Sequence, residues 1–327
     1  MTKRKLVRKA SWFLAVLFLL LNVVAFFHAW RFTHFSSTNQ PATKNAAGLS
    51  AGQKIKALFF GIVNPKPVNT ERPTVPYQTL RLQSNKEIDC WLLPVDSARG
   101  TVILFHGYRG EKSGMLDKAM EFRNLGYQTL LVDFMGSGGS EGYQTTIGFK
   151  EAAEVQTCLE YIQRQFPGPV FLFGTSMGAA AVLHAMDQYD LKPAGLILEC
   201  PFGSMYQTTC TRFRNMGVPC FPMAGLLVFW GGVQNGFWAF GHNPVDYARS
   251  VTCPVLLLFG EKDDRVSRAE IDAIYKNLAG PKELKSYPEA GHANYLGQYR
   301  QQWVADVSRF LEPYSRTSRE FPKNGKS

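Results

Sequence analysis

Short apolar runs that recur between helix-length segments restrict the fold of this chain more than any other feature. From the third run onward, segments such as 113–125, 147–165 and 177–189 separate them. Apolar strands that alternate with helices are typical of a mostly parallel sheet covered on both faces. We therefore predict an α/β fold whose sheet has eight strands, the first two forming a hairpin. The strands are expected at residues 78–83, 87–93, 101–106, 128–133, 170–174, 194–199, 254–259 and 283–287.

The interval 200–253 interrupts this alternation, because it contains no clean helix and strand pair. Its centre, FPMAGLLVFWGGVQNGFWAF at 221–240, is apolar, aromatic and rich in glycine. We interpret the interval as a cap-like insertion, either a packed crossover or a lid over an apolar pocket. The aromatic residues proposed to line such a pocket are Tyr108, Phe221, Trp230, Phe237 and Trp238.

The N-terminal segment Trp12–Trp30 carries no formal charge. As a helix it would span about 28 Å, close to the thickness of the hydrocarbon core of a bilayer. Five basic residues precede it and few follow, so the positive-inside rule predicts a cytoplasmic N-terminus with the remaining chain outside, periplasmic or extracellular in a bacterium. Residues 1–31 are accordingly predicted to be a basic cytoplasmic segment followed by a transmembrane signal anchor.

A cleaved signal peptide is the alternative, because Val23 and Ala25 form a small-residue cleavage pattern that would leave a secreted domain. The apolar run exceeds the usual length of about 7–15 residues, which favours the anchor. Residues 32–76 are polar and rich in proline and predict a stalk, within which KIKALFFGIV at 54–63 is expected on the membrane or on the domain. One domain is predicted over 77–313, followed by a polar basic tail at 314–327.

The charge balance argues against a nucleic-acid partner. The formal net charge is +10, but six positive charges and no acidic residue lie in the first 31 residues, which leaves +4 for the rest. No zinc-finger spacing is present, so we expect no nucleic-acid binding. The six cysteines include no CxxC pair, and we expect no metal site. Cys210 and Cys220 are the best candidates for a disulfide outside the cytosol, whereas Cys90 and Cys158 are expected to be buried thiols.

The segment VFLFGTSMG at 170–178 carries the clearest chemical signal, a GxSxG motif between a strand and a small-residue helix. A serine on such a sharp turn projects its hydroxyl above the sheet, and the flanking glycines avoid a clash. The start of the helix leaves N–H donors where negative charge would develop. Ser176 is therefore the candidate nucleophile.

A serine nucleophile needs a base and an acid, and both follow later in the chain. GEKDDRV at 260–266 follows one predicted strand and PEAGHANY at 288–295 follows the last one. Loops at the carboxyl ends of parallel strands converge on one crevice. We predict His292 as the general base and Asp263 or Asp264 as the acid. His184, within the predicted helix, and Glu199, at the end of another strand, are weaker candidates.

An oxyanion hole would take one backbone N–H from Met177 and a second from Tyr108 in HGYRG at 106–110. With HG, DFMGSGGSEG, GTSMG, GEKDDRV and AGH in this order, residues 78–312 resemble the α/β-hydrolase superfamily, in particular its esterase, thioesterase and aminopeptidase-like serine hydrolases. The resemblance implies Asp263 as the acid, because Val266 then falls at its usual place in a GxxDxxV pattern. It also implies that DFMGSGGSEG, from Asp133, is a structural turn, although Met135 stands where the family often has arginine.

The expected function is that of a membrane-anchored serine hydrolase that cleaves carboxylic esters or thioesters of acyl or otherwise hydrophobic substrates through an acyl-enzyme. No metal or organic cofactor is required. A serine peptidase with the same triad is one alternative, although the insertion shows no acidic cluster that would bind a free amine. A non-catalytic binding module tethered to the membrane is the other, and the intact set of Ser, His and Asp argues against it.

Overall fold

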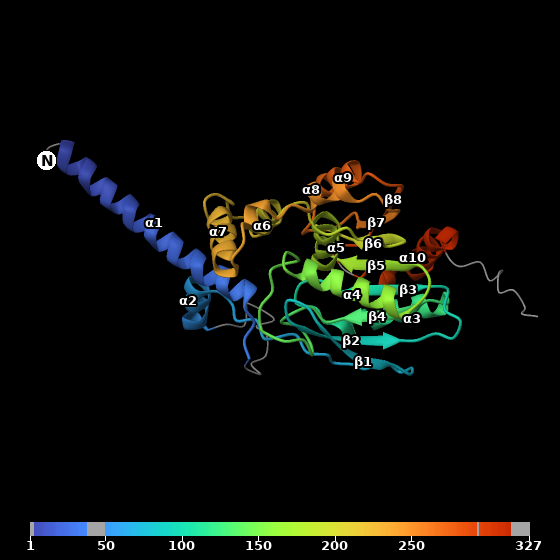
Figure 1. Ribbon diagram of the computed structural model, residues 1–327. Helices are drawn as coiled ribbons and strands as arrows, with labels where there is room; N and C mark the ends of the chain where they lie inside the picture. Colours follow the sequence, from blue (N-terminus) through green and yellow to red (C-terminus); the bar gives the residue numbers. More distant parts are fainter. Residues whose placement is uncertain (1–2, 38–49, 293, 315–327) are drawn as a thin grey trace, which may run out of the picture.

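A computed structural model describes residues 3–37, 50–292 and 294–314. Its described part contains an eight-stranded sheet in the order β1-β2-β4-β3-β5-β6-β7-β8 (Figure 1). β1 and β2 form an antiparallel hairpin, β2 pairs antiparallel with β4, and the remaining neighbours are parallel. The strands are β1 (Gln78–Gln83), β2 (Glu87–Leu93), β3 (Thr101–Phe105), β4 (Gln128–Val132), β5 (Val170–Thr175), β6 (Gly195–Glu199), β7 (Val255–Gly260) and β8 (Lys282–Tyr287). The predicted α/β fold is confirmed.

Helices cover both faces of the sheet because successive side chains of a strand point to opposite sides. Leu172 of β5 belongs to the core beneath α4 (Glu151–Gln165), α5 (Met177–Gln188), α8 (Pro244–Tyr247) and α9 (Arg268–Asn277). Its neighbours Phe171 and Phe173 belong to the opposite core, beneath α3 (Leu116–Asn124) and α10 (Tyr295–Leu311). Within the described residues, short 3₁₀ turns lie at η2 (Lys112–Met115), η3 (Ala239–Gly241) and η4 (Ala248–Ser250), and η5 (Glu312–Tyr314) follows α10.

The register of the parallel strands aligns their carboxyl ends. Phe105 of β3 lies opposite Gly174 of β5, and Thr175 of β5 lies opposite Glu199 of β6. Glu199 in turn lies opposite Leu258 of β7. The loops that follow these strands therefore leave the sheet at one edge, which is where a ligand crevice forms in parallel sheets.

The insertion at 200–253 folds as helices. It holds α6 (Met205–Asn215) and α7 (Met223–Asn235), followed by η3, α8 and η4. α7 packs against α1 (Lys3–Thr33) and α6 instead of against the sheet. Neither interpretation of the insertion, a packed crossover or a lid over an apolar pocket, describes α7 fully, because α7 packs against the N-terminal helix α1.

α1 extends away from the domain at its N-terminal end and lies beside α2 (Ala51–Phe60) and α7 at its C-terminal end (Figure 1). Its segment Val7–Thr33 is long and apolar enough to cross a membrane. Two stretches of the expected stalk lie along the domain: the N–H of Phe35 donates to the carbonyl of Tyr143 at 2.6 Å, and the N–H of Gly138 donates to the carbonyl of Pro67 at 2.9 Å. Residues 38–49 and most of the predicted tail at 314–327 lie outside the described residues.

The disulfide predicted between Cys210 and Cys220 is wrong, because both are free thiols. Burial of Cys210, followed by its hydrogen bond with the Cys220 thiol, raises its pKa. Cys90 and Cys158 are buried free thiols, as expected.

The turn between β5 and α5 depends on two glycines. A Cβ atom at Gly178 would collide with the carbonyl oxygen of Phe105 at the end of β3. A Cβ atom at Gly174 would lie 2.6 Å from the backbone nitrogen of Ala179. Both glycines let α5 begin directly above the sheet edge.

We expect Gly178→Ala to destabilise the detergent-solubilised full chain by about 1–3 kcal/mol, because the methyl group meets backbone atoms that cannot rotate away. Urea unfolding followed by circular dichroism measures this change. Gly297→Ala on α10 is the matched control, since nothing lies within 4 Å of its Cβ position. The control should unfold at the same urea concentration as wild type or at a higher one, and equal midpoints for Gly178→Ala and wild type would contradict the packing described here.

Candidate active site

Ser176 is held in an uncommon backbone conformation where β5 ends and α5 begins. Its φ is 53° and its ψ is −110°, values that a non-glycine residue rarely adopts. The N–H of Ser176 donates to the carbonyl of Glu199 at 2.8 Å, and its own carbonyl accepts from Ala180 at 3.0 Å. Such strain persists only where the surroundings enforce it, and it is concentrated at functional sites.

A continuous chain of hydrogen bonds joins Ser176, His292 and Asp263. The Ser176 Oγ atom lies 2.9 Å from His292 Nε2, and His292 Nδ1 lies 2.7 Å from Asp263 Oδ2. The other oxygen of Asp263 accepts from the backbone N–H groups of Arg265 at 2.7 Å and Val266 at 3.0 Å. With the carboxylate fixed on both sides, the neutral form of the imidazole would carry its proton on Nδ1 and accept at Nε2.

The other residues weighed as acid or base lie elsewhere. The side chain of Asp264 is exposed and forms an ion pair with Arg265. His184 Nδ1 lies 2.9 Å from the carbonyl of Phe149, within the core beneath α5. Glu199 is buried and accepts from the indole N–H of Trp303 at 2.9 Å. Only Asp263 of these three carboxylates is hydrogen-bonded to His292 in the described structure.

The loop after β3 faces Ser176 and contacts the end of α1. A Cβ atom at Gly107 would lie 3.3 Å from the carbonyl oxygen of Thr175, which puts this loop against the end of β5. Met177 is the first residue of α5, so its N–H has no acceptor within the helix. The hydroxyl of Tyr108 donates to the carbonyl of Phe32 at 2.6 Å, and the two rings stack at 4.5 Å. The guanidinium of Arg212 lies 4.8 Å from the Phe32 ring.

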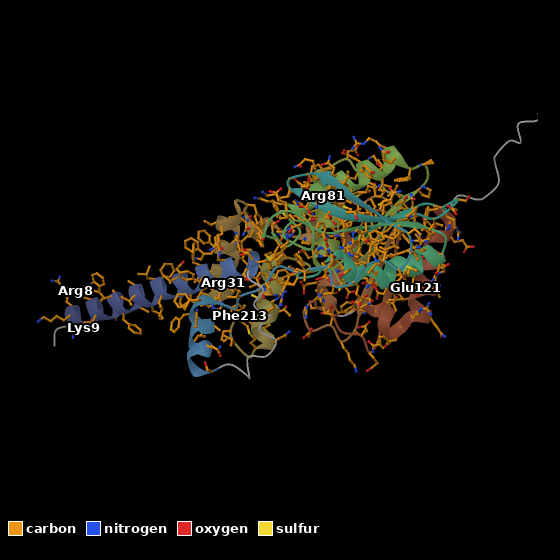
Figure 2. The ribbon with its side chains drawn as sticks, turned by 90° about the horizontal axis from the view of Figure 1, so that it is seen from below. Arg8, Lys9, Arg31, Arg81, Glu121 and Phe213 are labelled. Carbon is orange, nitrogen blue, oxygen red and sulfur yellow. The ribbon has the colours of Figure 1, made fainter. Side chains whose placement is uncertain are left out.

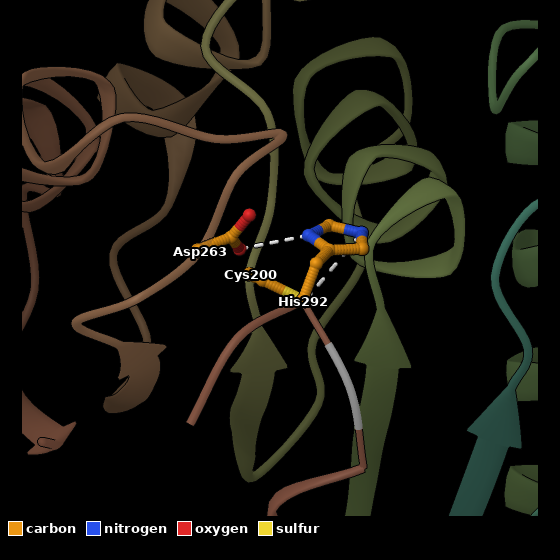
Figure 3. A group of neighbouring side chains, drawn as sticks. All are labelled: Cys200, Asp263 and His292. Carbon is orange, nitrogen blue, oxygen red and sulfur yellow. Dashed lines mark hydrogen bonds and ion pairs between the residues drawn. The ribbon is translucent and has the colours of Figure 1, made fainter. Parts of the chain in front are cut away.

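Cys200 is a member of this group that the sequence analysis did not single out. Figure 3 shows it beside Asp263 and His292, and its Sγ lies 4.0 Å from His292 Nε2. It is buried, with φ 41°, in the loop that follows β6. The sequence signal was its place directly after a predicted strand, at the edge where Ser176 also lies.

Cys200, Asp263 and His292 also offer three ligand atoms within 4.8 Å of one another. Thiolate, carboxylate and imidazole are ligands that zinc accepts. Both nitrogens of His292 are already hydrogen-bonded, one to Asp263 and one to Ser176. The arrangement therefore fits proton transfer along the chain of hydrogen bonds.

Two cavities lie near this edge of the sheet. One of about 190 Å³ is bordered by His292, Gly107, Thr175 and Lys118. A larger one of about 440 Å³ lies between α6, α8 and α9. The first is adjacent to the hydrogen-bonded chain and large enough for a small acyl or alcohol group.

The aromatic residues predicted to line a pocket border neither cavity. Trp230 packs against Phe26 of α1, with ring centroids 5.2 Å apart, and Phe237 stacks on Phe149 at 4.2 Å. Phe221 and Trp238 are largely exposed. Of the five, only Tyr108 lies in a loop that borders the site.

Comparisons with known proteins agree with this architecture. Residues 96–226 match the serine aminopeptidase family S33, and residues 219–309 match the dienelactone hydrolase family. An uncharacterized protein of Mycobacterium tuberculosis is 26% identical over 247 residues, which cover 73% of this chain and 80% of that protein. A lysophosphatidylserine lipase of Danio rerio is 25% identical over 228 residues, covering 65% of this chain and 56% of the lipase.

Among solved structures, an esterase of Pyrococcus furiosus superimposes with a TM-score of 0.65 at 21% identity. The match covers 77% of this chain and 97% of the esterase. At this level of identity the similarity establishes a common fold.

The neighbours of His292 set the pH at which Ser176 becomes reactive. Burial lowers the pKa of His292. Cys200 and the Asp263 carboxylate raise this pKa by a larger amount, so the net pKa lies above the usual 6.5. Only neutral His292 can accept the serine proton, so the reactivity of Ser176 should be lost as pH falls through this raised pKa.

We expect Cys200→Ala to move the midpoint of this pH profile to lower pH, because one of the groups that raise the pKa of His292 is removed. The rate of reaction with a fluorophosphonate, measured from pH 6 to 11, reports the midpoint, because the pKa of His292 is raised to about 10. Cys253→Ala, which removes a thiol that does not border the site, should leave the midpoint unchanged. Identical midpoints for Cys200→Ala and wild type would show that the thiol does not influence His292.

Proposed function

Because this chain belongs to the α/β-hydrolase superfamily, we propose that it is a membrane-anchored serine hydrolase that cleaves carboxylic esters or thioesters. The observation that carries the proposal is the hydrogen-bonded sequence Asp263, His292 and Ser176, with the serine on a strained turn at the carboxyl edge of the sheet. This arrangement is the one that turns a weakly nucleophilic hydroxyl into a nucleophile.

In the proposed reaction, Ser176 Oγ attacks the carbonyl carbon of the ester while His292 Nε2 accepts its proton. The resulting oxyanion is stabilised by the backbone N–H groups of Met177 and Tyr108. His292 then donates its proton to the departing alcohol or thiol, leaving an acyl group on Ser176. Water, deprotonated by His292, attacks this acyl-enzyme and releases the acid. Asp263 orients the imidazole and stabilises its charged form.

A hydrophobic substrate is supported by the setting of the site. The loop that carries Tyr108 contacts Phe32 at the end of an apolar helix that is a candidate membrane span. An acyl chain that partitions into a bilayer would therefore reach the site close to its source. The relatives include proteins described as an esterase and as a lysophosphatidylserine lipase, and we propose an ester of this general kind for the present chain.

We propose that α1 anchors the protein, with its N-terminus in the cytoplasm and the hydrolase domain on the opposite side. Arg8 and Lys9 lie at the free end of α1 and are exposed (Figure 2). No charged side chain follows until Arg31, at the end beside the domain. Basic residues are retained on the cytoplasmic side, which supports this orientation.

The first test of the proposed function is labelling of the full chain with a fluorophosphonate probe. We expect wild type and Ser250→Ala, a surface serine control, to be labelled, and Ser176→Ala to remain unlabelled with an unchanged circular dichroism spectrum. Hydrolysis of p-nitrophenyl esters should fall by about 10⁵–10⁶-fold in Ser176→Ala. A series from acetate to laurate reports the preferred acyl length. Folded wild type that is neither labelled nor active would favour a non-catalytic module, and cleavage of peptides alone would favour a peptidase.

The second test concerns the anchor. With an epitope at the N-terminus and alkaline phosphatase fused to the C-terminus, we expect both to stay in the alkaline-extracted membrane fraction and the phosphatase to be active outside the cytoplasm. Neutralising the basic residues before Ser11 should reduce the fraction in this orientation, because the positive-inside signal is lost. Loss of the epitope from a soluble, active phosphatase fusion would indicate a cleaved signal peptide.

A further inference from the structure

α7 is paired with the C-terminal half of α1 through specific polar contacts. The indole N–H of Trp230 donates to Asn22 Oδ1 at 3.1 Å, and Gln234 Nε2 donates to the carbonyl of Phe26 at 2.8 Å. Asn235 Nδ2 lies 3.3 Å from Thr33 Oγ1. In Figure 1, α7 lies beside the part of α1 nearest the domain, whereas the N-terminal part of α1 stands free. α7 is thus joined to the candidate membrane span itself.

The polarity of this helix pair is the reverse of that in a water-exposed pair. Polar side chains face inward, with Asn235 only 2% exposed, alongside the small buried residues Ala25 and Ala29 of α1. Apolar side chains face outward, with Phe229 40% and Val233 55% exposed on α7. Small residues and hydrogen-bonding side chains between helices, with apolar side chains outside, are characteristic of helices packed within lipid.

Charge is absent from this region of the insertion. From Asn215 to Val245 the chain contains no Asp, Glu, Lys or Arg. His242 lies in the same stretch, but burial lowers its pKa to about 3, so it is neutral. α7 therefore carries no group whose transfer into hydrocarbon would cost the free energy of burying a charge.

The length of α1 sets the depth of α7. Between Lys9 and Arg31 a helix rises about 33 Å, which matches a hydrocarbon core of about 30 Å. The contacts with α7 begin at Asn22, so the free part from Lys9 to Asn22 rises only about 20 Å. α1 can therefore span the core only if the half that is covered by α7 also lies within it.

We propose that α7 is a second membrane-embedded element, which lies in the same leaflet as the C-terminal half of α1 and exposes Phe229 and Val233 to lipid acyl chains. The proposal rests on the proposed anchoring by α1. The lipid bilayer is the partner that we assign to the exposed face of α7, because this face continues the apolar surface of the candidate span α1. α2, which contacts α1 and exposes Leu58 and Phe60, lies at the same end of α1.

The proposed membrane-embedded pair of α1 and α7 also ends close to the candidate active site. Thr33, which contacts Asn235 of α7, directly follows Phe32, whose carbonyl accepts the hydrogen bond from Tyr108. The loop proposed to stabilise the oxyanion is therefore held at the level where α1 leaves the membrane. The class of substrate that this placement favours is an amphiphilic ester that stays in the leaflet while its carbonyl reaches Ser176.

Photocrosslinking in the full chain tests the depth of α7. Benzoylphenylalanine replaces one aromatic residue at a time: Phe229 on α7, Phe18 on the free part of α1, or Tyr314 in η5 at the opposite end of the domain (Figure 1). Each variant is reconstituted in phosphatidylcholine vesicles with radiolabelled acyl chains and irradiated. Fluorophosphonate labelling of Ser176 in the same samples reports whether the domain is folded and reactive.

We expect the Phe229 variant to form lipid adducts at a yield within about threefold of the Phe18 variant and at least about tenfold above the Tyr314 variant. Adducts at Phe18 but not at Phe229 would overturn the proposal while the anchor stands. Crosslinks from Phe229 to a second copy of the chain would also overturn it. Absence of adducts at Phe18 would remove the anchoring on which the proposal rests. Loss of fluorophosphonate labelling alone would count against the proposed enzyme activity. The lipid adducts would still determine whether α7 lies within the membrane.

Discussion

The close approach of α5 to the carboxyl edge of the sheet is the constraint on which the remaining site depends. Gly178 brings the first turn of α5 against the end of β3, and this leaves Ser176 in a strained conformation between strand and helix. The strain directs the hydroxyl out of the sheet and toward the loops that follow β7 and β8. Since the parallel register aligns the strand ends, those loops bring Asp263 and His292 within hydrogen-bond distance without a further structural device.

The groups around His292 affect its charge as well as its position. The carboxylate of Asp263 is buried and accepts two backbone hydrogen bonds, which hold it in place while it orients His292. Cys200 adds a polarisable thiol on the other side of the ring. A histidine between these two groups favours its charged form more than a solvated histidine does. In the proposed reaction, that preference would stabilise the imidazolium that forms when Ser176 attacks a carbonyl group.

Local patterns predicted the parts of the molecule whose partners follow from strand order. All eight strands, and the meeting of Ser176, His292 and Asp263, follow from apolar runs and from the rule that strand ends converge. The insertion could not be predicted in this way. α7 is apolar on nearly every side, so its sequence has no periodicity that tells which face meets a partner. The apolar, aromatic composition of 221–240 predicts a pocket but does not indicate that Trp230 packs against Phe26 or that Phe237 stacks on Phe149. The place of Cys200 directly after a predicted strand is a weak signal, and its role becomes apparent only from its neighbours in space.

Under the proposed anchoring, the pairing of α1 with α7 would give the N-terminal helix a second role. An anchor on an extended stalk would restrict only the distance between the domain and the membrane, and the orientation of the site would vary. Here the end of α1 is joined to α7 by side-chain hydrogen bonds and to the loop after β3 by the bond between Phe32 and Tyr108. Arg212 of α6 lies against the same ring of Phe32, which joins the insertion to this contact. Orientation of the helix in a bilayer would thus also orient the groups around Ser176, so the membrane would position the site as well as locate the protein.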